Sequence, residues 1–323
     1  MSARGDLEAT LARLAVVWAD PLSPAAADEL RRALGNRSNL IVARAAEIVG
    51  EWELPGYVPE LVTAFDWFMG SESASAIRRD PTCAAKLALA EALVALDYDG
   101  GLFERGIAHV QPEPVWGGTE DTAARLRAVC ALGLARANPP DVLLRLATLL
   151  ADQEADARAG AAYAIARVAR PGAAALLWYK TLVGDDHILP LQACFAGLLA
   201  LEPVAAVLHI GGFLHSPIVA VAEAAASELG ASRLPAAGPL LREAWDLTRE
   251  PTLRRPLLAA VAHLRDEEGF AFLLNLLLQG QERDARDALA ALAVYRDDAR
   301  HWRKVERALL RRPELAPRGI DAS

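Results

Sequence analysis

The sequence predicts an all-α protein in which about eight helix pairs stack into an α–α superhelix. Three observations support this class. Alanine accounts for 68 of the 323 residues, and alanine has the highest helix propensity. Only 6% of the residues are aromatic. A helical motif also recurs at a nearly constant spacing, which is typical of stacked repeats. We therefore expect essentially no β-sheet.

The repeat is carried by a helix of the form Ala-Ala-x-Ala-Leu-x-x-Leu, which is seen most clearly from Ala161 to Val168. We take the Ile165 position as the phase marker. Its equivalents are Val49, Leu93, Leu132, Leu198, Leu229, Val261 and Leu292. The eight markers are separated by 44, 39, 33, 33, 31, 32 and 31 residues. The two longer separations predict insertions near residues 70–79 and 110–120.

An amphipathic helix precedes most of these motifs, so each unit is expected to be a first helix (A) followed by a second (B). The expected A helices span residues 58–69, 142–150, 173–183, 204–214, 239–247 and 270–278. The array would cover residues 24–296. Residues 1–23 are expected to form an N-terminal capping helix, and residues 297–323 a basic C-terminal cap and tail. Polar terminal helices end such an array.

The B-helix motif and its period resemble HEAT repeats, especially the short type found in phycobilisome-lyase-like proteins. In that family an Asp in the A–B turn and a basic residue six positions later form a ladder through the stack. Asp80 with Lys86, and Asp152 with Arg158, match the pattern. Elsewhere the pattern is lost, because Glu250 precedes Arg254 by only four residues, and Leu191 and Ala222 stand at basic positions. The resemblance implies an architecture more than a function.

The net charge and the cysteines limit the classes of protein to which this chain can belong. A net charge of −8 argues against a general nucleic-acid binder, which would present a basic face. Cys83, Cys130 and Cys194 lie in apolar helical stretches and are expected to be buried free thiols.

Residues 203–222 carry no Lys, Arg, Asp or Glu, and we interpret them as two buried repeat helices rather than a membrane span. The N-terminus does not resemble a signal peptide. We expect a cytoplasmic protein.

No catalytic motif is found. The sequence lacks phosphate-binding glycine loops, nucleophile elbows and zinc-binding His pairs. Asp185, Asp186 and His187 could bind a metal ion, but they lie where a turn and a helix N-cap are expected. We therefore expect no catalytic residues, no metal, no cofactor and no enzymatic activity.

The most irregular segment is the loop expected from His109 to Asp121, which contains two prolines, a Trp and a Gly pair. Loops on rigid scaffolds often carry function. The candidate binding residues here are His109, Gln111, Glu113, Trp116, Glu120 and Asp121. Trp116 has two interpretations: it contacts a partner, or it folds back over a neighbouring repeat and fills a packing gap, with Thr119 or Asp121 capping the next helix.

A second candidate surface is the concave one, which B helices line in HEAT arrays. The position two residues before each phase marker holds Glu47, Glu91, Cys130, Tyr163, Ala196, Ser227, Ala259 and Ala290. Of these we select Glu47, Glu91 and Tyr163 as binding residues, because the column changes from acidic to small and neutral along the chain.

The leading functional hypothesis is a non-enzymatic scaffold that binds a protein or peptide in the concave groove and through the 109–121 loop. One alternative is an enzyme by family analogy, because bilin lyases and alkylpurine DNA glycosylases use HEAT-like repeats. Another is an accessory or immunity-type protein of a bacterial secretion or conflict system.

Overall fold

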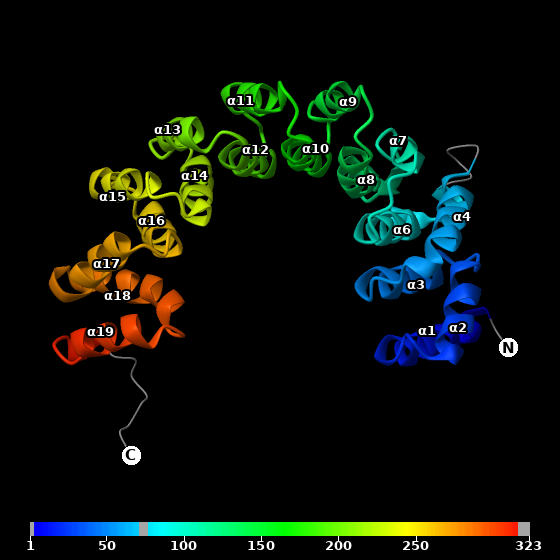
Figure 1. The fold of residues 1–323 in the computed structure, drawn as a ribbon, viewed down its shortest axis with the longest axis horizontal. Coiled ribbons are helices and arrows are strands. Elements are labelled where there is room, and N and C mark those ends of the chain that lie inside the picture. Colours follow the sequence, from blue (N-terminus) through cyan, green and yellow to red (C-terminus); the bar gives the residue numbers. More distant parts are fainter. Residues whose placement is uncertain (1–2, 71–76, 316–323) are drawn as a thin grey trace, which may run out of the picture. The chain divides into compact units, whose positions relative to one another are not determined.

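The structure is a computed structural model that describes residues 3–70 and 77–315. It confirms the all-α superhelix: antiparallel helix pairs follow one another along the chain, and within each of the two units described below successive B helices pack on one another (Figure 1). The chain divides into two compact units between Leu176 and Leu177, inside one helix. Each unit is described separately below.

The first unit contains two rows of helices, which Figure 1 shows side by side. One row is formed by α3 (Asn39–Glu51), α6 (Ala84–Ala95), α8 (Ala124–Ala137) and α10 (Ala155–Val168). The other is formed by α2 (Pro24–Leu34), α4 (Val58–Met69), α7 (Leu102–Gly106) and α9 (Val142–Leu149), and α1 (Ala3–Ala19) precedes them. Short 3₁₀ segments, Pro55–Tyr57 and Pro81–Cys83, lead into α4 and α6.

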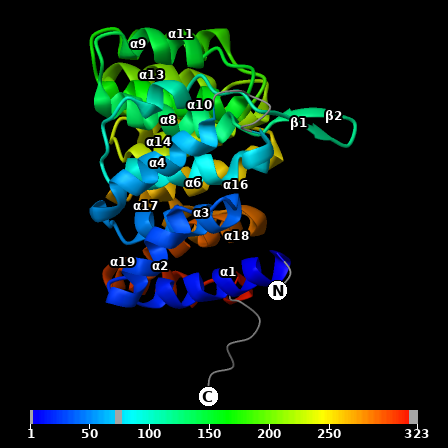
Figure 2. The same cartoon turned by 90° about the vertical axis from the view of Figure 1, so that its right-hand side faces the viewer.

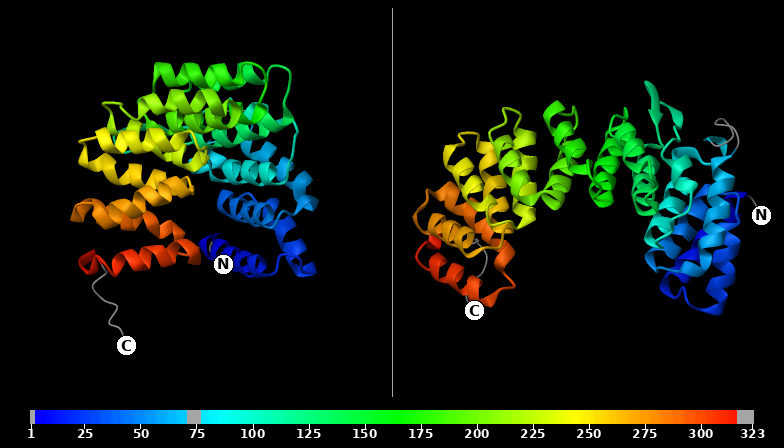
Figure 3. Two further views of the ribbon diagram at one scale, coloured as in Figure 1. Left: turned by 60° about the vertical axis from the view of Figure 1, so that its left-hand side comes forward. Right: turned by 45° about the horizontal axis from the view of Figure 1, so that its top comes forward.

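The second unit begins within α11 (Ala173–Val183) and repeats the arrangement (Figure 3). Its B helices are α12 (Ile188–Leu201), α14 (Val219–Ser232), α16 (Pro251–His263) and α18 (Glu282–Leu292). Its A helices continue with α13 (Pro203–Phe213), α15 (Ala237–Leu247) and α17 (Glu267–Gln279), and α19 (Ala299–Leu309) follows. The 3₁₀ segments Ala293–Tyr295 and Pro313–Leu315 flank α19.

Small residues allow the B helices to pack closely. A Cβ atom on Gly160 of α10 would lie 2.4 Å from the Cα of Ala128 on α8, so no larger residue fits there without a shift of the helices. The phase markers are buried as expected, with one exception. Leu132 is only half-buried, whereas Leu134 is buried and stands at the equivalent position. The register of the third repeat was therefore wrong by two residues.

The prediction of essentially no β-sheet is wrong for the second insertion. Residues 112–121 form an antiparallel hairpin of β1 (Pro112–Val115) and β2 (Gly118–Asp121). Pro112 pairs with Asp121, and Val115 with Gly118. Trp116 and Gly117 form the two-residue connection. Gly117 has a φ of +96°, a conformation that glycine adopts at no steric cost.

Two other expectations can be compared with the structure. All three cysteines are free and buried, and burial raises the pKa of the Cys83 thiol to about 12. Within residues 3–70 and 77–315 no helix is both long and apolar enough to cross a membrane. Most of the insertion expected at 70–79, and the tail from 316 to 323, lie outside the described residues.

Candidate functional site

The hairpin projects away from the helices, and Trp116 lies at its tip (Figures 2 and 3). The Trp116 side chain is fully exposed, with a relative accessible surface of 105%. The interpretation in which this residue folds back into a packing gap is therefore wrong. The hairpin carries Trp116 outward because its base is bound to the helical unit by polar groups.

Gln111 is the buried residue at the base of the hairpin. Its side-chain Nε2 donates to the backbone oxygen of Asp80 at 2.8 Å and to Oε1 of Glu113 at 2.6 Å. Its backbone N–H donates to Oδ1 of Asp121 at 2.9 Å. A buried amide with all these bonds satisfied holds its neighbours in one arrangement.

Glu113 connects the first strand to the turn before α6. Its Oε1 atom also accepts from the backbone N–H of Thr82 and from the hydroxyl of Thr122, both at 2.7 Å. Burial raises the pKa of this carboxyl, but the hydrogen bonds from Gln111, Thr122 and Thr82 together outweigh burial and lower it. Glu113 is therefore ionised and fixed in place.

Arg127 of α8 connects the second strand to the next repeat. It is buried, and its guanidinium contacts Asp121 at 2.6 Å and makes a two-point contact with Asp152, both bonds being 2.9 Å long. Arg127 also donates to the backbone oxygen of His109. Such a bidentate, charge-assisted contact is strong, and it also holds the two side chains in one geometry. The hairpin, which lies in the A–B turn between α7 and α8, is thus bound to the A–B turns of the preceding and the following repeat.

The turn residue Asp80 completes the base. Its carboxylate lies 3.2 Å from the Nζ atom of Lys86, and both side chains are fully buried. It also accepts from the backbone N–H groups of Ala85 and Lys86 at the start of α6. This pair matches the six-residue ladder that the resemblance implied. In the second pair with this spacing, Asp152 and Arg158, the Arg158 side chain donates to the backbone oxygen of Asp152.

The structure separates the candidate residues of the 109–121 segment into two groups. His109, Gln111, Glu113 and Asp121 form the base of the hairpin, and Nε2 of His109 lies 3.1 Å from Oε1 of Gln111. Trp116 and Glu120 are exposed. Asp121 and Arg127 are also six residues apart, which is the spacing of Asp80 from Lys86, so the sequence contains a signal for this pair. Asp121 accepts from Ala123 N–H just before α8, which starts at Ala124.

The three B-helix candidates lie in the first unit, and two of them are on neighbouring helices. Glu47 on α3 and Glu91 on α6 are both about half exposed and line a hollow of about 330 Å³ with Trp18 and Glu51. Burial raises the pKa of the Glu91 carboxyl. Tyr163 lies further along the chain on α10 and is also about half exposed. Cys130 does not belong to this column, because it is fully buried.

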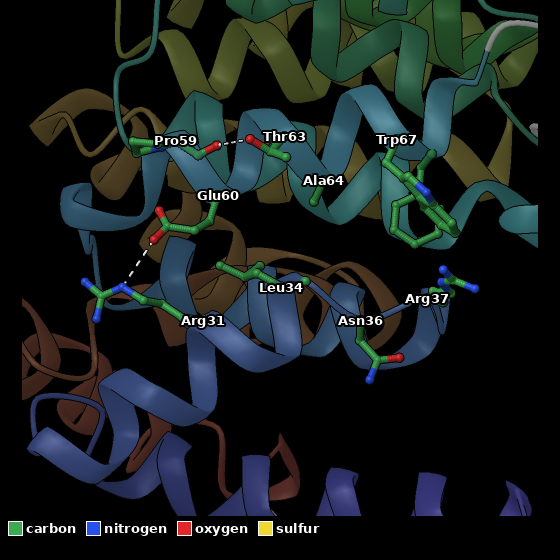
Figure 4. A pocket seen from close by; sticks show the side chains of 11 residues that line it. Arg31, Leu34, Asn36, Arg37, Pro59, Glu60, Thr63, Ala64 and Trp67 are labelled. Atoms are coloured by element: carbon green, nitrogen blue, oxygen red, sulfur yellow. Dashed lines mark hydrogen bonds and ion pairs between the residues drawn. The ribbon is translucent and has the colours of Figure 1, made fainter.

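A pocket of about 350 Å³ lies between α2 and α4, and no pattern in the sequence predicted it (Figure 4). Its lining includes the buried residues Leu34, Ala64 and Phe68 and the exposed residues Trp67 and Arg37. α2 ends at Leu34, three residues before Arg37, and α4 ends at Met69, two residues after Trp67.

Comparison with known proteins yields only likenesses of fold. No family model matches the chain, and no curated protein matches it in sequence. One similar solved structure is the complex of CpcE and CpcF of phycocyanin lyase from Nostoc sp. This match has 17% identity and a TM-score of 0.36, and it covers 90% of this chain and 94% of that one. Another is human deoxyhypusine hydroxylase, with 19% identity, a TM-score of 0.32 and coverage of 80% and 91%. What the structure itself shows is a succession of antiparallel helix pairs.

Both of these solved structures are of enzymes. The expectation that this chain is not an enzyme is contradicted by them, and we withdraw it. The physical reason is that catalysis depends on site residues and not on the fold, so the absence of familiar motifs did not justify the exclusion.

Proposed function

We propose that this protein binds a protein partner through the 112–121 hairpin, with Trp116 as the central contact. The observation that supports the proposal is the contrast within the hairpin: its tip is a fully exposed Trp, and its base is a buried polar network. Trp is among the residues most often found as binding hot spots. A hairpin fixed at its base loses less conformational entropy on binding than a free loop does.

The two edges of the hairpin differ in what they offer a partner. The backbone N–H of Thr122 donates to Gln111 at 3.1 Å, so this pair is hydrogen-bonded, and alternation makes Glu113–Glu120 and Val115–Gly118 hydrogen-bonded pairs as well. The backbone groups of Pro112 and Pro114 therefore face outward, and proline has no N–H to donate. The outer edge of β2, by contrast, presents the N–H and C=O groups of Thr119.

This asymmetry favours an extended partner segment that pairs with β2 and places an apolar side chain against Trp116. Strand addition of this kind obtains affinity from main-chain hydrogen bonds and specificity from side chains. Glu120 lies on β2, and Glu47 and Glu91 are exposed on α3 and α6 of the same unit. Acidic groups at these positions favour a partner segment that contains Lys or Arg.

The test uses the purified full-length protein, immobilised, to capture partners from native lysate, followed by affinity measurement with the captured protein. Trp116→Ala should weaken binding by about 2 kcal/mol, or roughly thirtyfold in Kd. Thr119→Pro removes the outward N–H and should weaken binding, whereas Thr119→Val retains it and should not. Trp52→Ala is the matched control, because Trp52 is another exposed Trp of the same unit, outside the hairpin. Equal binding by wild type and Trp116→Ala would refute the proposal.

A further inference from the structure

The pocket between α2 and α4 is open because small side chains face it (Figure 4). Pro59, Thr63 and Ala64 of α4 line it, and none of them is long enough to reach across to α2. Leu34 of α2 and Phe68 of α4 also line it, and both are buried. The lining is therefore largely apolar, and the space between the two helices is free for another molecule.

Aromatic rings occupy the corresponding space between successive A helices of the second unit. Trp178 of α11 stacks on His209 of α13, with centroids 3.8 Å apart. The rings of Trp245 on α15 and Phe272 on α17 meet edge to face at 5.6 Å. α2 contains no aromatic residue, so no such pair can join it to α4. A planar ring supplied by a ligand would complete the contact that these pairs make elsewhere.

Trp67 forms a fixed wall at one end of the pocket (Figure 4). Its ring lies edge-on to Phe68, with centroids 4.7 Å apart and planes at 88°. The guanidinium of Arg79 lies 5.0 Å from the centre of the same ring, and Arg79 donates to the backbone oxygen of Trp67 at 2.8 Å. The Trp67 side chain is nevertheless 38% exposed. It is thus held in place and still offers surface to a ligand.

The lining carries one more positive charge than negative charge. Its single carboxylate, Glu60, lies 3.2 Å from Arg31, and this pair closes one end of the pocket (Figure 4). Arg37 lies at the opposite end, near Trp67. It is exposed, and it forms no ion pair or hydrogen bond with any residue of 3–70 and 77–315. Arg37 is therefore the uncompensated charge of the pocket.

Nearby negative groups do not cancel this charge. Asp66, the other acidic residue of α4, is paired with Arg105. The C-terminal ends of α2 and α4 lie near Arg37 and Trp67, and each carries about half a negative charge. Arg37 and Arg79 carry a full positive charge each, so the balance at this end is positive. Charge complementarity therefore favours an anionic ligand.

We propose that this pocket binds a small aromatic carboxylate, with its ring between α2 and α4 and its carboxylate on Arg37. The ring would lie against Trp67 and Leu34. A single guanidinium matches the one charge and the planar shape of a carboxylate, which it binds through two parallel hydrogen bonds. A volume of about 350 Å³, a largely apolar lining and a few polar groups are typical of small-molecule sites.

The test is isothermal titration calorimetry of the full-length protein with 2-naphthoate as the probe. Wild type should bind one equivalent. Thr63→Phe places a ring in the pocket from an exposed position, and Arg37→Gln removes the charge. Each should raise the Kd at least about tenfold, the equivalent of about 1.4 kcal/mol. Arg167→Gln is the matched control, because Arg167 is another exposed arginine of the first unit, outside the pocket, and it should bind like wild type.

The uncharged probe 2-naphthamide separates the ring from the carboxylate. It should bind wild type about tenfold more weakly than 2-naphthoate does, and Arg37→Gln should not weaken it further. Circular dichroism should show the same helix content in all variants, since every substituted side chain is exposed.

The proposal is overturned if wild type shows no saturable binding of 2-naphthoate, or if Thr63→Phe or Arg37→Gln binds it as well as wild type does. Equal affinity of wild type for the two probes would also overturn it. Concentration-dependent dimerisation of wild type that Thr63→Phe abolishes would assign the pocket to a second copy of the chain and would overturn it as well. These outcomes are independent of the hairpin and of its partner.

Discussion

The two candidate binding sites place polar and apolar side chains in opposite ways. At the hairpin, charged groups such as Asp80, Lys86 and Arg127 are buried beneath a projecting aromatic tip. At the pocket between α2 and α4, apolar side chains such as Leu34 are buried, and the charged side chain of Arg37 is exposed. Buried polar groups specify one arrangement but leave little margin for substitution. An apolar lining beside an exposed charge leaves surface available for a ligand.

The comparison predicts its largest stability effect at the buried base of the hairpin. Asp80→Ala would leave the Lys86 ammonium buried without its partner and would remove two hydrogen bonds to the start of α6. We expect the free energy of unfolding to fall by about 3–5 kcal/mol, as measured by urea denaturation.

Asp66→Ala is the control for that measurement. Asp66 is also paired with an arginine, Arg105, but both side chains are half exposed. An exposed pair contributes about 0–1 kcal/mol. If the two variants lose equal stability, burial of the charge is not what distinguishes the base of the hairpin.

A smaller effect is expected in acid. Burial raises the pKa of the Asp121 carboxyl, but bonds from Gln111 N–H, Ala123 N–H and Arg127 outweigh burial and hold it below its ordinary value. Its contribution to stability is therefore complete above the unfolded-state pKa of about 4 and is lost as the pH falls through the folded-state value.

Urea denaturation at a series of pH values from about 5 to 3 measures this dependence. Asp121→Asn should give a shallower decline in stability over that range than wild type does. Glu250→Gln in the second unit is the comparison, because bonds from Thr252 lower the pKa of this exposed carboxyl and solvent screens it. An equally shallow decline in the Glu250→Gln variant would show that the buried network is not the acid-sensitive element.

The smallest stability effect is expected at the hairpin tip. Trp116→Ala removes a side chain that buries no surface in the free protein, so the free energy of unfolding should change by no more than about 0.5 kcal/mol. Thermal unfolding of the variant measures this. A loss of several kcal/mol would mean that Trp116 packs against the protein in solution and would remove the contrast between tip and base.

The helical array was predictable because its signal is periodic and local. The A helix expected at 173–183 has those same limits in the structure, and the buried markers follow the 31–33-residue spacing from Leu134 onward. The third repeat was misplaced because Asp121 was assigned to an irregular loop, which concealed its six-residue spacing from Arg127. Prolines and glycines at 112–118 correctly indicated an interruption but did not indicate strands.

Which side chains are exposed could not be predicted from a periodic pattern, as the helices could. Whether Trp116 points outward depends on how Gln111 and Glu113 fix the hairpin, and these contacts reach back to residues near Asp80. Likewise, the uncharged sequence of α13 is compatible with a buried helix. Only the three-dimensional packing shows that the Val204 and Leu208 side chains are exposed, which corrects the expectation that residues 203–222 form buried helices.

The two prolines of β1 also limit how far these hairpins can aggregate. A fibril grows only if each added strand offers a fresh row of amide donors on its far side. Two hairpins that paired along β2 would present only proline-containing strands outward, at Pro112 and Pro114, so growth would stop at four strands. The segment can thus keep one strand edge exposed on a projecting arm without becoming a seed for polymerisation.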